Sequence, residues 1–227
     1  MSGNVRSAKC ATRTVSDAAR PHGFLRTIMT GPGPLASPLP RTVEGPRLEL
    51  FIYTTGQVDR VREVIDTSRP HLATFLGWAI VPASREDDLQ RAADGEVAWR
   101  EGRGAQYVIC EDGQVRGMIG LHRRGGPDEL EIGYWLAADA TGRGIMTEAC
   151  TMATTAAFRS AEINAVEITH DMNNHRSGAV PVRLGFRRVG AFTSVAFTTQ
   201  DSRINLRWRM ERAVWTARTG TNSVDDC

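Results

Sequence analysis

The feature that most constrains the fold is a strand-like segment joined to a helix-like segment through two glycines. Leu130 to Leu136 has the apolar character of a strand, and Ile145 to about Ser160 has the length and apolar content of a helix. Gly142-Arg143-Gly144 lies between them. Glycines let the backbone approach a ligand closely, and the N–H groups and dipole at a helix N-terminus favour an anion. The segment is therefore a candidate phosphate site.

This turn alone is not specific, because two glycines before a helix more often form a plain turn. It is not a Walker A sequence, since no Gly-Lys-Ser follows. It is not a dinucleotide-binding fingerprint either, since Thr147 occupies the third glycine position. The segments around the turn must therefore decide its function.

The remaining segments predict strands and helices in a characteristic order. Asp112-Gly113 joins two apolar segments and is a strong hairpin signal. Ser84, with Asp87 three residues later, is typical of a capped helix start. We expect strands near 48–53, 106–111, 114–122, 130–136, 165–170, 187–197 and 204–212, and helices from 58 to Pro70, over about 16 residues after Ser84, at 145–160 and at 174–184. This order predicts an α+β fold with a mixed sheet rather than a doubly wound fold.

The sequence predicts less ordered structure at the two ends of the chain. Residues 1–46 hold six of the ten prolines, and six basic residues against two acidic ones, so we expect a disordered basic arm rich in proline and glycine. Met29 is an alternative start of the protein. Residues 47–212 then form one domain, and residues 213–227 form a flexible tail.

Composition excludes several classes of protein. The formal net charge of +2 is carried by the basic arm, so the domain has no positive excess that would favour nucleic acid. The four cysteines lack metal-site spacing, and Cys110 and Cys150 lie in apolar segments where we expect them to be buried. No apolar run suits a membrane span or a secretory signal. We expect a cytoplasmic protein without a metal.

Three motifs follow one another along the chain in a fixed order. The first is Leu76-Gly77-Trp78 with Ser84-Arg85-Glu86-Asp87; the second is Glu131-Ile132-Gly133-Tyr134-Trp135-Leu136 with Thr141-Gly142-Arg143-Gly144-Ile145-Met146-Thr147-Glu148-Ala149; the third is Asn174-His175-Arg176-Ser177 with Leu184-Gly185-Phe186. Over about residues 47–212 the chain thus resembles the GNAT superfamily of N-acetyltransferases. Within it the motifs are most similar to those of the RimJ/RimL ribosomal-protein N-terminal acetyltransferases.

The resemblance implies a GNAT fold, with a mixed, mostly antiparallel sheet of six to seven strands flanked by about four helices. It implies an acyltransferase that moves an acetyl group from acetyl-CoA to a primary amine, which is a protein N-terminal α-amine in RimL-like members. The residues that it implies for acetyl-CoA binding are Trp135, Leu136, Gly142, Arg143, Gly144, Ile145, Met146 and Asn174. The family commonly has Arg or Gln where this chain has Asp139, so positive charge for the pyrophosphate must come from elsewhere.

Acetyl transfer needs a base for the amine and an acid for the departing thiolate. The resemblance places Ser177 near the coenzyme sulfur as the candidate acid, and Glu131 on the strand before the glycines as the candidate base. RimL-type enzymes are also thought to use a glutamate on the last hairpin, where this chain has Ala196. The alternative bases are Asp201, His122 and His170.

Plainer interpretations stay open beside these. Asn174 can be a helix N-cap, Ser177 an inert serine in a first helical turn, and Glu131 an ordinary glutamate on a solvent face. The acceptor can be a small molecule such as an antibiotic or polyamine, because a fold does not determine a substrate. The chain can also be a non-catalytic acyl-CoA-binding domain, and it can form a homodimer.

Overall fold

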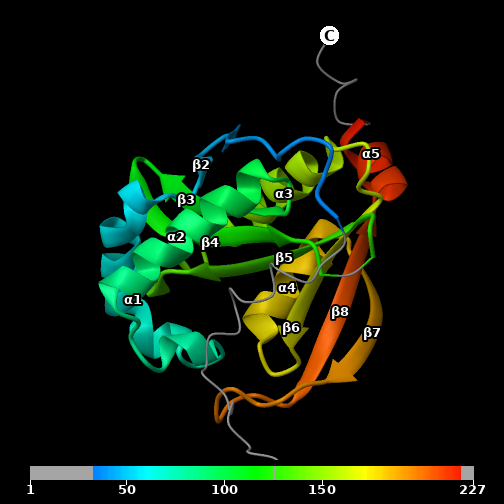
Figure 1. The fold of residues 1–227 in the computed structure, drawn as a ribbon. Coiled ribbons are helices and arrows are strands. Elements are labelled where there is room, and N and C mark those ends of the chain that lie inside the picture. The colour runs from blue at the N-terminus through cyan, green and yellow to red at the C-terminus, as the bar shows by residue number, and fades with distance from the viewer. Residues whose placement is uncertain (1–32, 125, 221–227) are drawn as a thin grey trace, which may run out of the picture.

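The structure is a computed structural model that describes residues 33–124 and 126–220. It is built around one β-sheet. Its eight strands are hydrogen-bonded in the order β1-β2-β3-β4-β5-β6-β8-β7 (Figure 1). All neighbours are antiparallel except β5 and β6, which are parallel. The strands are β1 (Thr42–Glu44), β2 (Leu48–Ile52), β3 (Gly104–Glu111), β4 (Gln114–His122), β5 (Glu129–Leu136), β6 (Ala165–Asp171), β7 (Arg187–Thr193) and β8 (Ile204–Glu211).

Helices cover both faces of this sheet. In the described part of the chain they are α1 (Val58–Leu72), α2 (Arg85–Arg100), α3 (Ile145–Phe158), α4 (His175–Leu184) and α5 (Arg212–Gly220). Residues of α1 and α2 pack in one apolar cluster, and residues of α3, α4 and α5 pack in the other. The predicted α+β class is confirmed, with one strand more than the expected six to seven and one helix more than the expected four.

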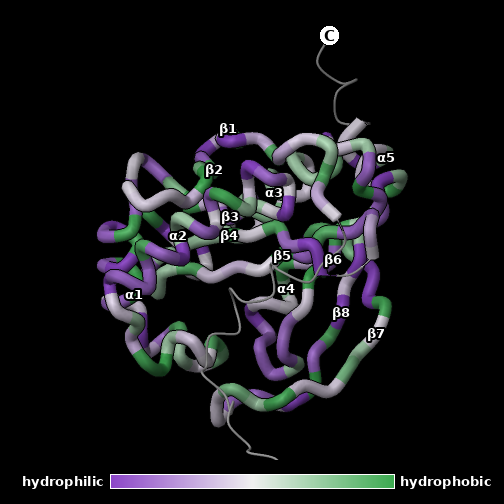
Figure 2. The backbone as a smooth tube through the Cα atoms, viewed as in Figure 1, coloured by the Kyte–Doolittle hydropathy of each residue, from purple (hydrophilic) through white to green (hydrophobic). Residues whose placement is uncertain are grey.

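Strand alternation explains the two clusters. On β3, Tyr107 and Ile109 face the α3 side, while Val108 and Cys110 face α1 and α2. The helix α1 alternates between hydrophilic and hydrophobic residues along its length, as a helix with one buried face must (Figure 2). Cys110 and Cys150 are buried and unbridged, as the sequence predicts.

Two local signals in the sequence are confirmed in atomic detail. Asp112 and Gly113 both have positive φ, 51° and 72°, which is the geometry of a tight hairpin turn between β3 and β4. The Ser84 hydroxyl accepts from the Asp87 backbone N–H at 3.0 Å, and the Asp87 carboxylate accepts from the Ser84 N–H at 3.3 Å. This reciprocal cap begins α2 at Arg85.

The structure corrects the predicted start of the domain. Order does not begin near residue 47, because β1 pairs with β2 and the side chains of Leu35 and Leu39 are only 5% and 4% exposed. Residues 33–46 therefore belong to the domain and not to a disordered arm. The proline content of this segment predicted disorder, and its buried leucines are too far apart to form a helical or strand-like apolar pattern. The predicted arm over residues 1–32 lies outside the described residues.

The predicted flexible tail is also wrong in part. Residues 213–220 belong to α5, whose Trp215 is only 6% exposed and packs in the α3-side cluster. A short helix with one buried aromatic ring gives little periodic signal, so the sequence did not indicate it. Residues 221–227 lie outside the described part of the chain.

We predict that Leu35→Ala lowers the free energy of unfolding by about 2–5 kcal/mol, because it empties a buried site. Urea unfolding should show a lower midpoint with an unchanged m-value. The neighbouring exposed Ser37→Ala is the matched control, expected to stay within about 0.5 kcal/mol of wild type. Equal stabilities for both variants would mean that residues 33–46 do not pack on the domain.

Candidate active site

A gap between β5 and β6 creates the site. Their parallel ladder ends at the pair Ile132 and Ile168. Beyond it, residues 133–136 of β5 stay paired with β4 on one side but have no ladder partner on the β6 side. Their backbone groups on that side are therefore available to bind a ligand.

The N-terminus of α3 faces the same space. Gly142 and Gly144 have φ of 77° and 79°, and Gly144 is the N-cap of the helix. The strand–turn–helix that the sequence predicts is thus present. The first-turn N–H groups of α3 have no partner within the helix, so this end can bind an anion.

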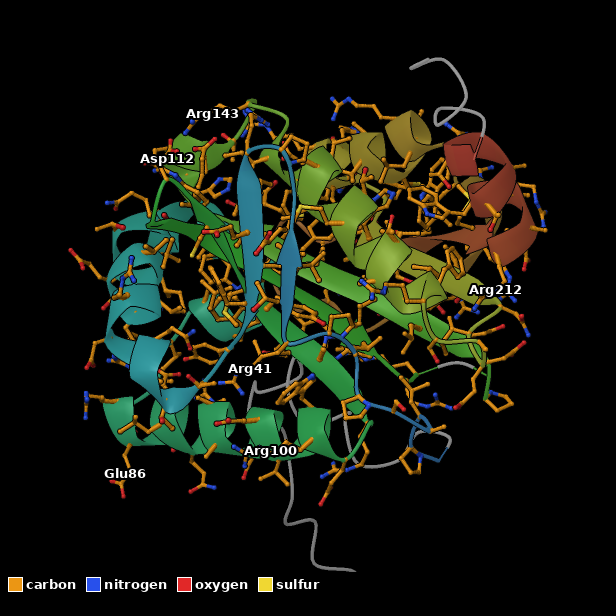
Figure 3. The ribbon with its side chains drawn as sticks, turned by 90° about the horizontal axis from the view of Figure 1, so that it is seen from above. Arg41, Glu86, Arg100, Asp112, Arg143 and Arg212 are labelled. Atoms are coloured by element: carbon orange, nitrogen blue, oxygen red, sulfur yellow. The ribbon has the colours of Figure 1, made fainter. Side chains whose placement is uncertain are left out.

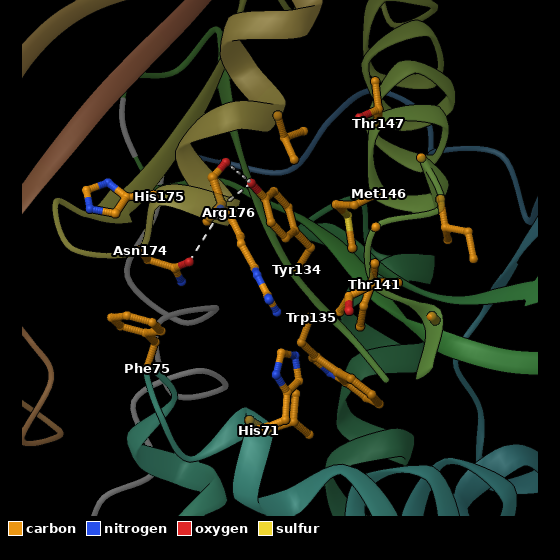
Figure 4. A pocket seen from close by; sticks show the side chains of 18 of the residues that line it. His71, Phe75, Tyr134, Trp135, Thr141, Met146, Thr147, Asn174, His175 and Arg176 are labelled. Carbon is orange, nitrogen blue, oxygen red and sulfur yellow. Dashed lines mark hydrogen bonds between the residues drawn. The ribbon is translucent and has the colours of Figure 1, made fainter. Parts of the chain in front are cut away.

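The N-terminus of α4 lies across the gap. The Asn174 side chain accepts from the Ser177 backbone N–H at 3.2 Å, so Asn174 is the helix N-cap. The Tyr134 hydroxyl donates to the Ser177 carbonyl oxygen at 3.1 Å and lies 2.9 Å from the Ser177 hydroxyl (Figure 4). Burial raises the pKa of Tyr134 far above its usual range, so this hydroxyl stays protonated.

One cavity of about 1360 Å³ joins these elements. It extends from the start of α3, past the gap, to the end of α1 and the loop after it. Eight of the ten predicted site residues line it: Trp135, Leu136, Gly142, Gly144, Ile145, Met146, Asn174 and Ser177.

Arg143 is a predicted binding residue that does not line this cavity. Its guanidinium lies 2.7 Å from the Glu111 carboxylate, close to the β3–β4 hairpin at Asp112 (Figure 3). Glu111 is buried and also faces Arg116 at 3.2 Å. The side chain of Arg143 is therefore engaged on the outer side of the turn.

Glu131 also lies outside the cavity lining. Its carboxylate accepts from Arg124 at 3.0 Å, and Glu167 is its ladder partner on β6. Burial raises the pKa of Glu131, and the Arg124 guanidinium opposes that shift. The role of Glu131 as base stays a prediction, with its carboxylate held in an ion pair beside the site.

The alternative bases are engaged elsewhere. The Asp201 carboxylate accepts from the Thr198 N–H and hydroxyl, both at 3.0 Å, which organises the β7–β8 loop. His170 lies 2.8 Å from the Asp171 carbonyl through Nδ1, and its Nε2 accepts from the Trp208 N–H at 3.0 Å. His122 is buried at the end of β4. These three residues are thus held within the fold by hydrogen bonds or burial, and none of them lines the cavity.

The cavity carries positive charge that does not come from the glycine turn. Arg176 and Arg183 on α4 line it. Glu148 lines it as well, but its carboxylate accepts from the Arg47 guanidinium at 2.9 Å. Asp139 has a side chain that is 74% exposed and faces Arg116. An acidic residue at position 139 therefore leaves the cavity's positive charge intact.

Comparison with known proteins now places this site in a family. Residues 47–187 match the family described as the acetyltransferase (GNAT) domain. The chain belongs to the GNAT acetyltransferases. The resemblance found in the sequence motifs is confirmed.

Named relatives support this assignment. YdaF of Bacillus subtilis (strain 168), provisionally named a ribosomal N-acetyltransferase, is 34% identical over 134 residues, which cover 58% of this chain and 73% of YdaF. The ribosomal-protein-serine acetyltransferase of Escherichia coli (strain K12) is 24% identical over 151 residues, 66% of this chain and 84% of the relative. The fold also matches a RimL structure, a ribosomal L7/L12 α-N-protein acetyltransferase with coenzyme A, at a TM-score of 0.70 and 19% identity, covering 76% and 99% of the two chains.

No helix in residues 33–124 and 126–220 has the length and apolar content needed to cross a membrane. Over the same residues, no three His, Cys, Asp or Glu side chains are grouped as metal ligands.

Sequence reasoning missed three residues of this GNAT site. The second motif contains Tyr134 but gives it no role, although its hydroxyl binds Ser177. Arg176 and His71 line the cavity; the third motif contains Arg176 but assigns it no role, and His71 lies outside all three motifs. His71 is the next-to-last residue of α1, where only the packing of α1 beside β4 and residues 138–140 shows what it faces.

We predict that His122 makes this protein less stable in mild acid. Burial lowers the pKa of His122 to about 3, so the native state holds it neutral while the unfolded chain takes up a proton below about 6.5. The contribution of His122 is complete above about pH 6.5 and is lost as pH falls, at up to about 1.4 kcal/mol per pH unit.

Urea unfolding at several values between pH 7 and pH 5.5 tests this. His122→Gln should show a shallower loss of unfolding free energy with falling pH than wild type. The exposed His175→Gln is the control and should keep the wild-type slope. Equal slopes for His122→Gln and wild type would contradict the burial of a neutral histidine.

Proposed function

We propose that this GNAT acetyltransferase transfers an acetyl group from acetyl-CoA to the α-amine of a protein N-terminus. The single observation that carries the proposal is the continuous cavity, which connects an anion-binding helix end to the β5–β6 gap and to a second lobe at the end of α1. At about 1360 Å³ it exceeds the roughly 300–1,000 Å³ of a site for one small ligand, so it has room for a donor and an acceptor.

The residues present fit acetyl-CoA. The N-terminus of α3 suits the pyrophosphate. Apart from its chain neighbours, no described residue lies within 4 Å of the position that a Cβ on Gly142 would take, so the backbone there is open to a ligand. Arg183, which lines the cavity, supplies a cationic group for phosphates. The backbone of β5 residues 133–136 lacks β6 partners and can bind an extended amide-containing arm.

Bound acetyl-CoA supplies the acetyl group as a thioester. In the proposed reaction, a backbone N–H of β5 donates to the thioester oxygen and stabilises the negative charge that develops there. The Ser177 hydroxyl, oriented by Tyr134 at 2.9 Å, donates a proton or a hydrogen bond to the departing sulfur.

The acceptor class rests on the relatives. Their names describe acetylation of ribosomal proteins, and the cavity continues beyond the gap to His71, Phe75 and Leu76, where a peptide terminus can lie. A ribosomal acceptor would place the reaction in the cytoplasm.

Titration calorimetry and peptide acetylation test this function. The full chain should bind acetyl-CoA and should acetylate peptides that begin with serine, alanine or methionine, with release of one thiol for each acetyl group. Activity confined to small amines in a parallel panel would overturn the protein N-terminal acceptor. Absence of acetyl-CoA binding would overturn the catalytic function and leave the fold as a partner-binding domain.

We predict that Ser177→Ala lowers kcat by about 10- to 100-fold and changes the apparent KM for acetyl-CoA much less, because the hydroxyl acts on the departing sulfur. Steady-state kinetics at saturating acceptor measure both constants. Thermal unfolding of the variant serves as the control for folding. An unchanged kcat would remove Ser177 from the mechanism.

A further inference from the structure

We propose that the imidazole of His71 is the general base that takes the proton from the acceptor amine. This inference deepens the proposed function and rests on it. It assigns a base that the sequence motifs leave to Glu131.

The position of His71 suits a base. His71 lies in the last turn of α1 and lines the acceptor lobe of the cavity together with Phe75 and Trp135. Figure 4 shows its ring beside Trp135, directed into the space between α1 and α4. Trp135 follows Tyr134 on the part of β5 that has no partner in β6. His71 therefore faces the segment where the thioester is expected.

The ring nitrogens of His71 are available to accept a proton. Within residues 33–124 and 126–220, no hydrogen bond or ion pair engages the imidazole of His71, whereas both ring nitrogens of His170 have partners. The ring of His175 is directed away from Tyr134 and His71 (Figure 4). An imidazole that lines a cavity and has both nitrogens available can accept a proton from a bound amine or through one water.

The surroundings of His71 favour its neutral form. Burial lowers the pKa of His71, and the Arg176 guanidinium, which points toward it in Figure 4, lowers it further. The ring is thus neutral at pH 7 and able to act as a base. The other charged groups lining the cavity are Arg183 on α4 and Glu148 on α3, whose carboxylate is paired with Arg47.

The proposed step balances. His71 takes one proton from the acceptor ammonium, and the resulting neutral amine attacks the thioester carbon. A C–N bond forms and the C–S bond breaks. The departing sulfur takes a proton from the Ser177 hydroxyl, and the second proton lost by the attacking nitrogen restores that hydroxyl. The proton on His71 passes to water, so the products are an N-acetyl amide, a thiol and one proton.

The test compares the pH dependence of kcat for wild type and His71 variants with an acceptor that the wild type uses. Wild type should show an acid limb below about pH 6.5, where His71 becomes protonated. His71→Gln should lose this limb and lower kcat by about 100-fold at pH 7.5, with an unchanged apparent KM for acetyl-CoA. Added imidazole should partly restore His71→Ala, which a purely structural role would not allow.

Matched variants separate His71 from its rivals. Glu131→Gln and His175→Gln should both keep the acid limb. Arg176→Gln should move the limb to higher pH, because it removes a neighbouring positive charge. Thermal unfolding of each variant controls for folding, and His71→Asn provides a second replacement.

Three outcomes would overturn the inference. A wild-type kcat and acid limb in His71→Gln and His71→Asn would exclude His71 as base while leaving the proposed function intact. Loss of the limb in Glu131→Gln alone would assign the base to Glu131. A wild type that transfers acetyl to no peptide and no amine would overturn the proposed function, and this inference with it.

Discussion

The site depends on the end of the ladder between β5 and β6 after Ile132 and Ile168. A parallel pair that continued would close the sheet and satisfy its own backbone, leaving nothing for a ligand. Beyond the end of the ladder, the Tyr134 hydroxyl of β5 binds both the carbonyl and the hydroxyl of Ser177 at the start of α4. This contact links β5 to a helix N-terminus across the gap. The same interaction therefore positions the serine that we expect to act on the sulfur.

Environment divides the histidines of the described chain into different roles. Complete burial keeps His122 neutral and inert, and two hydrogen bonds fix the ring of His170 against Trp208. His71 combines partial burial with a nearby guanidinium, and no residue in the described part of the chain hydrogen-bonds to either of its nitrogens, which is the combination that a base needs near neutral pH. Glu131 is in the opposite situation, because its carboxylate is paired with Arg124. A carboxylate held in that pair must give up a charge-assisted hydrogen bond before it can accept a proton.

Much of this architecture could be predicted from the sequence because its signals are local. The Asp112-Gly113 turn and the cap at Ser84 are set by backbone conformation and by contacts three residues apart, and the structure confirms both. The start of the domain could not be predicted, since Leu35 is buried by distant segments and not by its neighbours. For the same reason the motifs located most of the cavity lining but not His71, whose position depends on how α1 packs beside β4 and residues 138–140. The sequence could not show that the side chain of Arg143 pairs with the buried carboxylate of Glu111 and does not line the cavity.

The two lobes of the cavity also separate two electrostatic tasks. The α3 end offers backbone N–H groups to an anion, and it tolerates the acidic side chain of Asp139 because that carboxylate is exposed and faces Arg116. The acceptor lobe must instead receive an ammonium group and release a neutral amine. A cation such as Arg176 beside that lobe disfavours the ammonium form and favours the neutral nucleophile, while it also keeps His71 unprotonated. The guanidinium thus promotes loss of the proton from the amine and opposes its storage on the base, so the proton is passed on to water.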